Sequence, residues 1–305
     1  MQNARPPKQP QPDSPHTDLG NGLRRILAPN PSPMTLHGTN SYLVGTGEVA
    51  LIDPGPNIAA HATALQSALH KGERISHILV THSHLDHSPL ARPLAEFYGA
   101  KIYAYGPATA GRSPQMQALA DAGLIAGGEG IDATFTPDVS LADGDTLAHG
   151  DWSLTALHTP GHLSNHLCFA SGTTLFSGDH VMGWASSLVS PPDGDMAAYM
   201  ASTRRLAAQN WQVIHAGHGD PITDPVARLA FLLRHREQRE TEILAQLAHG
   251  PSTVQTLTQT LYTDTPPALH PAAQRNVLAH LLDLVQQGRV TARPAPGFSA
   301  RYSLA

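Results

Sequence analysis

Cysteine and long apolar runs are both scarce in this sequence of 305 residues. The one cysteine, Cys168, excludes an internal disulfide framework and fits a reducing compartment. No apolar run approaches the ~18 residues of a membrane span, so no contact with a membrane is expected. The first fifteen residues are polar and lack the apolar stretch of a secretory signal. These absences favour a cytoplasmic location.

Charged residues make up only 14% of the chain, and they are unevenly placed. Residues 1–225 carry 11 Lys and Arg against 19 Asp and Glu, whereas residues 226–305 carry 8 against 5. The acidic part can supply carboxylates to a metal site. The net charge of +3 in the second part permits nucleic-acid binding but is far from a basic footprint.

One short stretch, residues 80–88, concentrates potential metal ligands. An apolar run that predicts a buried strand leads into it, and Ser88-Pro89 is a favourable helix start after it. Alternate residues of an extended segment point the same way, so His82 and His84 can bind one ion. Asp86 and His87 then turn toward a second position. Imidazole and carboxylate ligands without cysteine favour a catalytic zinc site over a closed structural one.

Further acids and histidines stand where other predicted strands end. They are Asp53, Asp179, His218 and, after a Pro-Gly turn, His162. The alternation of strands and helices, with polar residues at strand ends, is typical of α/β folds. Asp53 is either a turn former or the hydrogen-bond partner of a ligand histidine. His166 either contacts the substrate or an oxyanion or is structural.

Together these residues resemble the metallo-β-lactamase-fold hydrolases over residues 24–225, with the motif His82-x-His84-x-Asp86-His87 intact. The resemblance implies a four-layer αβ/βα sandwich with a two-metal site on its rim. By position, the first metal is expected on His82, His84 and His162. The second is expected on Asp86, His87 and His218, with Asp179 bridging. Two Zn²⁺ are expected, and iron or manganese are alternatives. An acid at position 179 disfavours β-lactamase activity.

The stretch of residues 30–40 and the C-terminal part are similar to a subgroup that contains a mitochondrial endoribonuclease. Fungal polyketide thioesterases share the front half of this pattern. The polar, proline-rich composition of residues 1–20 predicts a disordered tail. The resemblance then implies a catalytic domain (21–225) followed by a winged-helix domain (226–305). Three amphipathic helices and a C-terminal hairpin are predicted in the last part.

The third of these helices would be the recognition helix of a winged-helix DNA reader. Between residues 271 and 287 it offers only Arg275 and His280, opposed by Asp283. Specific DNA binding is therefore not expected. We expect the domain to pack beside the active site or to mediate a homodimer. Residues 106–130 are expected to form a small helical lid, with Met116 facing inward.

The resulting hypothesis is a dinuclear zinc hydrolase. Two metals about 3.5–4 Å apart can bridge a water and lower its pKa to about 7. The hydroxide would attack a carbonyl carbon or phosphorus, and Asp86 would shuttle a proton. The subgroup and the net charge of residues 226–305 favour single-stranded RNA as substrate. The acidic catalytic part favours the alternative, a small acyl thioester or lactone. A non-catalytic binding module is at odds with the complete ligand set.

Overall fold

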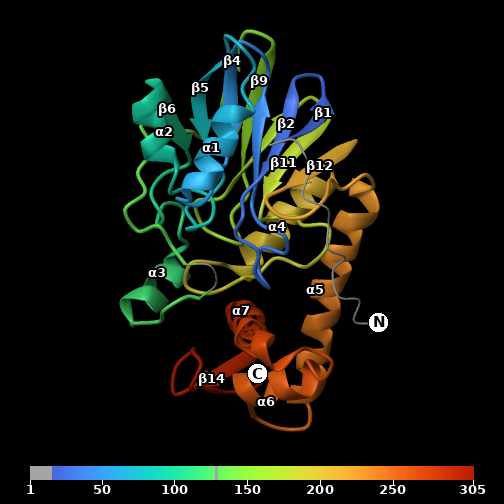
Figure 1. The fold of residues 1–305 in the computed structure, drawn as a ribbon. Helices are drawn as coiled ribbons and strands as arrows, with labels where there is room; N and C mark the ends of the chain where they lie inside the picture. The colour runs from blue at the N-terminus through green and yellow to red at the C-terminus, as the bar shows by residue number, and fades with distance from the viewer. Residues whose placement is uncertain (1–15, 128–129) are drawn as a thin grey trace.

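Two mixed sheets form the body of the molecule in the computed structural model, which describes residues 16–127 and 130–305 (Figure 1). In this part of the chain the first sheet has seven strands, paired in sequence order. They are β1 (Thr17–Gly20), β2 (Leu23–Leu27), β3 (Asn40–Val44), β4 (Glu48–Ile52), β5 (Arg74–Leu79), β6 (Lys101–Ala104) and β7 (Val139–Ser140). The second sheet, in the order β12-β11-β10-β9-β8, comprises β8 (Thr146–His149), β9 (Trp152–His158), β10 (Leu167–Ser171), β11 (Thr174–Gly178) and β12 (Val213–Ala216).

The sheets pack face to face, and helices cover their outer faces. Tyr42 of β3 and Phe176 of β11 meet in the apolar core between the sheets, with ring centroids 5.3 Å apart. Helices α1 (Ala59–Ser67) and α2 (Ala91–Tyr98) cover the first sheet. Helix α4 (Met196–Ala207) and the start of α5 (Pro225–Leu247) cover the second. The predicted four-layer sandwich is therefore confirmed.

The N-terminal boundary differs from the expected one. The disordered tail was expected to reach residue 20, yet β1 occupies residues 17–20 and pairs with β2 in antiparallel register. The pattern of β1 is mostly polar because the strand lies at the sheet edge, so hydrophobic alternation does not reveal it. The remainder of that expectation concerns residues 1–15, which lie outside the described residues.

The predicted winged-helix domain is also present, below the sheets in Figure 1. Its elements are the end of α5, β13 (Ser252–Thr253), α6 (Val254–Leu261), a 3₁₀ turn (Pro267–Leu269), α7 (His270–Gln286), β14 (Val290–Arg293) and β15 (Arg301–Leu304). The strands pair in the order β13-β15-β14. None of the helices in the described residues is long and apolar enough to cross a bilayer.

Two elements connect the domains. Helix α5 places Leu232 in the core beside the second sheet and Ile243 in the core of the winged helix. Helix α3 (Pro114–Asp121) lies in the segment expected to form a lid, and its Met116 is buried in the winged-helix core. The segment is thus anchored on the C-terminal domain. Residues 128 and 129 of the expected lid lie outside the described residues.

Candidate metal centre

The predicted ligands come together on one rim of the sandwich, where the loops after the strands face α7 (Figure 1). The loop after β5 contributes the four residues of the motif. Loops after β9, β11 and β12 contribute His162, Asp179 and His218. All seven side chains are buried. Their ligand atoms form two groups, each with all atoms within 4.8 Å of one another.

The first group contains His82, His84, His162 and Asp179. His84 Nδ1 lies 3.0 Å from His82 Nε2 and 3.1 Å from His162 Nε2, so three ring nitrogens converge on one point. Burial lowers the pKa of His84 to about 3, and it also lowers those of the other two histidines. Metal binding requires the neutral ring, so these histidines are in the form that ligates a cation.

The second group contains Asp86, His87 and His218. Asp86 Oδ2 lies 3.3 Å from His87 Nε2 and 3.2 Å from His218 Nε2. Burial alone would lower the pKa of His218, but the carboxylates of Asp179 and Asp86 raise it to about 10. Burial favours the neutral form of Asp86, yet the charge of His87 and the adjacent His218 ring keep its pKa below the usual value. The group is therefore a pair of rings organised around negative charge.

Asp179 contacts rings from both groups. Its Oδ1 lies 3.4 Å from His87 Nε2, and its Oδ2 lies 3.3 Å from His218 Nε2 and 3.8 Å from His162 Nε2. A carboxylate with its two oxygens between two ligand groups is placed as a bridging ligand would be. The predicted bridge between two metals is compatible with this position and stays a prediction.

Several ligand atoms lack a hydrogen bond although they are buried. Among the described residues these include Asp86 Oδ1, His87 Nε2, Asp179 Oδ1 and His218 Nε2. A buried polar atom without a partner costs about 1–3 kcal/mol, so native proteins rarely leave four together. Cations at these positions would satisfy the two ring nitrogens and Asp179 Oδ1, with Asp86 bound through Oδ2, the oxygen that lies beside both rings. The nitrogen and oxygen donors fit zinc, iron or manganese, and the two groups together could hold a dinuclear site.

Outer hydrogen bonds orient the ligand rings. Asp53 accepts a hydrogen bond from His87 Nδ1 at 2.9 Å and one from the backbone N–H of Thr81 at 2.7 Å, which agrees with the second of its two predicted roles. His218 Nδ1 donates to the Gly38 carbonyl at 3.0 Å, and His162 Nδ1 donates to the Leu188 carbonyl at 2.7 Å. Each bond leaves Nε2 directed at the centre. Sequence reasoning missed both carbonyls, because a backbone acceptor has no residue signature.

Of the two roles predicted for His166, the contacts in the structure agree with the structural one. It is fully buried, its Nδ1 is 2.9 Å from Thr159 Oγ1, and its Nε2 accepts the backbone N–H of Asp179 at 3.3 Å. Both ring nitrogens are thus engaged within the protein, and the predicted contact with substrate or an oxyanion is corrected. Its spacing after His162 brought it near the centre, but its ring lies beneath the ligands and supports the backbone at Asp179.

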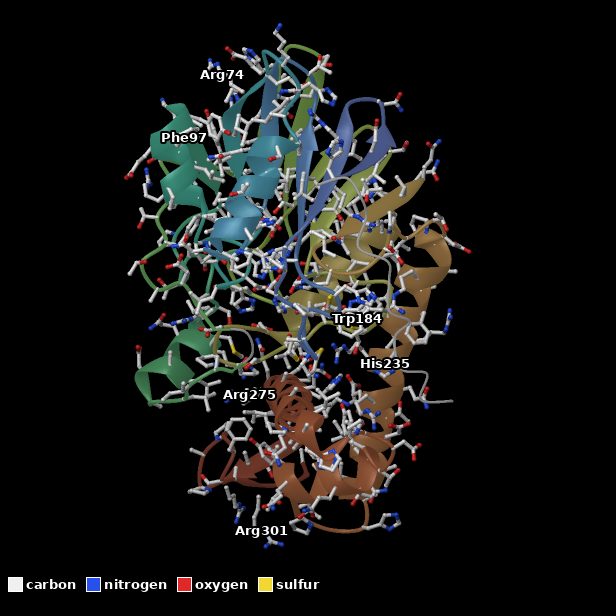
Figure 2. All side chains as sticks on the ribbon, viewed as in Figure 1. Arg74, Phe97, Trp184, His235, Arg275 and Arg301 are labelled. Carbon is white, nitrogen blue, oxygen red and sulfur yellow. The ribbon has the colours of Figure 1, made fainter. Side chains whose placement is uncertain are left out.

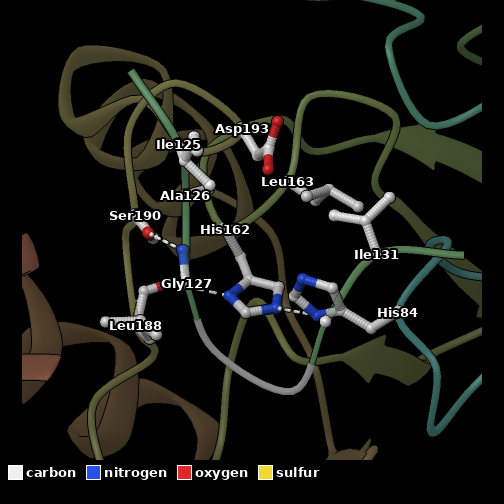
Figure 3. Close-up of a pocket in the computed structure, with 11 residues that line it drawn as sticks. His84, Ile125, Ala126, Gly127, Ile131, His162, Leu163, Leu188, Ser190 and Asp193 are labelled. Atoms are coloured by element: carbon white, nitrogen blue, oxygen red, sulfur yellow. Dashed lines mark hydrogen bonds between the residues drawn. The ribbon is translucent and has the colours of Figure 1, made fainter. Parts of the chain in front are cut away.

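A cavity of about 230 Å³ opens beside His84 and His162 (Figure 3). The rest of its lining is mostly apolar and comprises Ile125, Ala126, Gly127, Gly130, Ile131, Leu163, Leu188, Ser190 and Asp193. A second cavity of about 190 Å³ lies between the catalytic and winged-helix domains and also contacts Leu188. Its lining includes Met34, Trp184 and Tyr262. Two apolar cavities thus adjoin the residues around the centre.

Comparisons with known proteins agree with this architecture. Residues 34–218 match the metallo-β-lactamase superfamily, and residues 253–295 match the β-lactamase-associated winged helix domain. The chain is 32% identical over 289 residues to a "Beta-lactamase-like protein 2 homolog" of Drosophila melanogaster, covering 90% of this chain and 91% of that protein. It is 33% identical over 247 residues to an "Atrochrysone carboxyl ACP thioesterase" of Aspergillus fumigatus, covering 77% of this chain and 68% of that protein.

Among solved structures, a metallo-β-lactamase family protein from Thermus thermophilus superimposes with a TM-score of 0.74 at 27% identity. The match covers 94% of this chain and 100% of that one. The matched regions thus contain both the ligand-bearing sandwich and the C-terminal domain. The chain belongs to the metallo-β-lactamase superfamily and carries the winged-helix domain associated with that fold.

Proposed function

We propose that this protein hydrolyses acyl thioesters with an apolar acyl group at a dinuclear zinc centre. The observation that carries the proposal is the lining of the cavity beside His84 and His162: it is mainly apolar, and its described residues include no Lys or Arg. Its carboxylate, Asp193, pairs with Arg112 at 2.6 Å, and burial raises the pKa of Asp193. Such a cavity suits a hydrocarbon chain better than a charged group.

RNA is the rival substrate. Proteins bind the phosphates of RNA through Lys and Arg, so an RNA substrate would require such side chains within reach of the centre. Among the arginines that give residues 226–305 their positive charge, Arg236 is buried with only 2% of its surface exposed. Arg239 packs over the Tyr262 ring and pairs with Glu242, and Arg289 pairs with Glu240. Arg301 is exposed but lies at the far end of the winged-helix domain (Figure 2). These four arginines are therefore poorly placed to guide phosphates to the centre, which favours the acyl substrate.

The chemistry assigns distinct tasks to the residues of the centre. Two divalent ions bound by the two groups would supply an activated water and polarise the substrate carbonyl. Asp86 Oδ1, buried and without a hydrogen bond, is free to orient the attacking water and to take its proton. A thiolate leaves readily, since a thiol has a pKa near ~8.5, so no protonated acid is needed in the cavity. The thioesterase name of the Aspergillus fumigatus relative supports the same reaction.

The metal part of the proposal has its own test. Protein purified without added metal should contain about two zinc ions per chain by elemental analysis, because the centre offers two groups of nitrogen and oxygen ligands. Two iron or manganese ions per chain would correct the identity of the metal but would still support the proposed binding site. One ion that persists when His84 and His218 are both replaced would show that these groups are not the binding site.

The substrate test uses one preparation and several substrates. We expect metal-dependent hydrolysis of a long-chain acyl-N-acetylcysteamine thioester, lost on chelation and in Asp86→Ala. A lactone, an unstructured RNA and a nitrophenyl phosphodiester are assayed in parallel. Cleavage of RNA that disappears in Asp86→Ala, together with no thioester turnover, would overturn the acyl proposal in favour of a nuclease.

A further inference from the structure

The segment Ser187–Ser190, which leads from β11 toward α4, contacts both cavities and is held from the C-terminal side. The Ser187 carbonyl accepts a hydrogen bond from Arg236 of α5. The backbone N–H of Val189 donates to Asn276 Oδ1 at 3.0 Å. Arg275 Nη1 donates to Ser190 Oγ at 3.3 Å. Helices α5 and α7 therefore hold three of the four residues of this segment.

On its inner side the same segment contacts the metal centre. The Leu188 carbonyl accepts from His162 Nδ1 at 2.7 Å, which directs His162 Nε2 toward His84 Nδ1 (Figure 3). Because a ligand histidine is oriented by the acceptor at its other nitrogen, the position of Leu188 sets the position of His162. The backbone of Leu188 lies between residues that α5 and α7 hold, so the C-terminal helices reach the centre through one intermediate segment.

Helix α7 also holds the wall of the cavity beside His84 and His162. Ser190 Oγ also accepts the Gly127 N–H at 3.0 Å, and Arg275 Nη1 donates to the Ile125 carbonyl at 2.9 Å. A Cβ on Gly127 would lie 2.4 Å from Arg275 Nε, so the two are in close contact. Ile125 and Gly127 line the cavity beside the centre. Figure 2 shows Arg275 at the junction between α7 and these loops.

The contacts leave this side of α7 unavailable to nucleic acid. Asn276 Oδ1 accepts a second hydrogen bond, from Arg236 Nη1 at 3.3 Å, and Ala279 is buried with Val189 and Tyr199. A recognition helix needs its side chains free to reach base edges. Here, consecutive polar residues of the corresponding helix are bonded to the catalytic domain instead.

We propose that Arg275 and Asn276 are positioning residues of the active site, acting through the segment Ser187–Ser190. Asn276 sets His162 through Leu188, and Arg275 sets the wall formed by Ile125 and Gly127. The winged-helix domain is thus a structural part of the metal centre and of its substrate cavity. The inference rests on the metal part of the proposed function in its first test and on the acyl substrate only in one readout of its second.

The first test measures zinc affinity by titrating metal-free protein against a chelating indicator. In Asn276→Ala, one of the two ions should bind more weakly by up to about tenfold, because loss of a direct outer-shell partner costs about 10–100-fold and Asn276 acts one step further out, through Leu188. Asn276→Asp keeps an acceptor for Val189 and Arg236 and should restore binding. Circular dichroism checks that both variants are folded. Unchanged affinity for both ions in folded Asn276→Ala would refute the link to His162.

The second test concerns the cavity wall. In Arg275→Met, amide hydrogen exchange in a peptide covering residues 122–127 should become about tenfold faster, because Ile125 loses its donor and Ser190 a partner. For thioesters of increasing acyl length, KM should rise most for the longest chains while kcat changes little. Arg275→Lys, which keeps a donor, should recover part of both effects.

The matched control is Arg301→Met, an exposed arginine of the same domain that donates to the Pro251 carbonyl. It should leave the exchange and the KM profile unchanged. Exchange in Arg275→Met equal to that of the wild type would overturn the role of Arg275. Zinc affinity and exchange need no substrate, so a failure to find thioester hydrolysis would count against the proposed function alone.

Discussion

Asp179 places its carboxylate oxygens near rings of both ligand groups, so loss of its charge should affect both groups. Asp179→Asn keeps the size of the side chain but removes the charge. We expect zinc affinity and hydrolysis to fall by about 10–100-fold or more, while the fold survives because the residue lies on a rim loop. Zinc titration and thermal unfolding of the metal-free protein measure the two effects. The exposed Asp121→Asn is the control, and near-normal turnover by Asp179→Asn would contradict a bridging role.

His61 gives a pH-dependent contribution to stability away from the ligands. It is fully buried beside Ser41, and burial lowers its pKa to about 4. Between pH 6.5 and 4 the unfolded chain therefore binds a proton that the folded chain does not. The free energy of unfolding should fall, as pH falls through this window, by up to about 1.4 kcal/mol per pH unit from this residue.

His61→Gln removes this titration and retains a polar partner for Ser41. Its free energy of unfolding should fall less steeply than that of the wild type below about pH 6.5, and the two slopes should agree above about pH 7. Denaturant titrations at a series of pH values measure the difference, in which contributions from other histidines cancel. Parallel curves throughout the acidic window would argue against a neutral, buried His61.

At the scale of elements, α3 derives its anchorage from the C-terminal domain. Met116 is only 3% exposed and belongs to the same core as Ile243 and Leu281. Met116→Ala should lower the free energy of unfolding by about 2–4 kcal/mol, since it leaves a cavity in that core. Met116→Leu, of similar volume, should cost less than about 1.5 kcal/mol. Chemical denaturation of both variants provides the comparison, and equal losses would indicate that the core does not close around this side chain.

The strands that carry the ligands were predictable because each is an apolar run ending in a polar residue. The motif of residues 82–87 located the centre. The Pro-Gly turn before His162 indicated that another loop contributes a ligand. The polar edge strand β1 was not predictable from periodicity. Helix α5 was predicted as part of the winged helix, yet its first half packs on the second sheet, because one amphipathic helix can serve two cores in succession.

The hydrogen-bond shell was less predictable than the ligands. Asp53 was recognisable from its position at a strand end. The carbonyls of Gly38 and Leu188 were not, since every residue has one. His166 shows the opposite error: a residue type suited to catalysis, four positions after a ligand, is used to support the backbone. Chemistry-bearing residues indicate a site, but tertiary contacts decide which of them face the substrate.

At the scale of the whole molecule, α5 contributes side chains to two cores, and α3 ties the catalytic part of the chain to the second of them. A continuous helix that contributes to both cores couples their stabilities. We expect one cooperative thermal transition, with equal calorimetric and van't Hoff enthalpies, that moves to higher temperature when zinc binds. Differential scanning calorimetry with and without zinc makes the measurement. Two separate transitions would show that the winged helix unfolds independently of the metal-binding domain.

The dependence of the Ser187–Ser190 segment on α7 also has a consequence for biosynthesis. Every predicted ligand precedes residue 219, whereas Arg275 and Asn276 are translated later. At roughly 5–20 residues per second, a ribosome needs about 3–14 s to proceed from His218 to the end of α7 at Gln286. During that interval the nascent chain holds the ligands without the helix that orients His162. The active site therefore matures late, after the polypeptide that contains its ligands has already emerged.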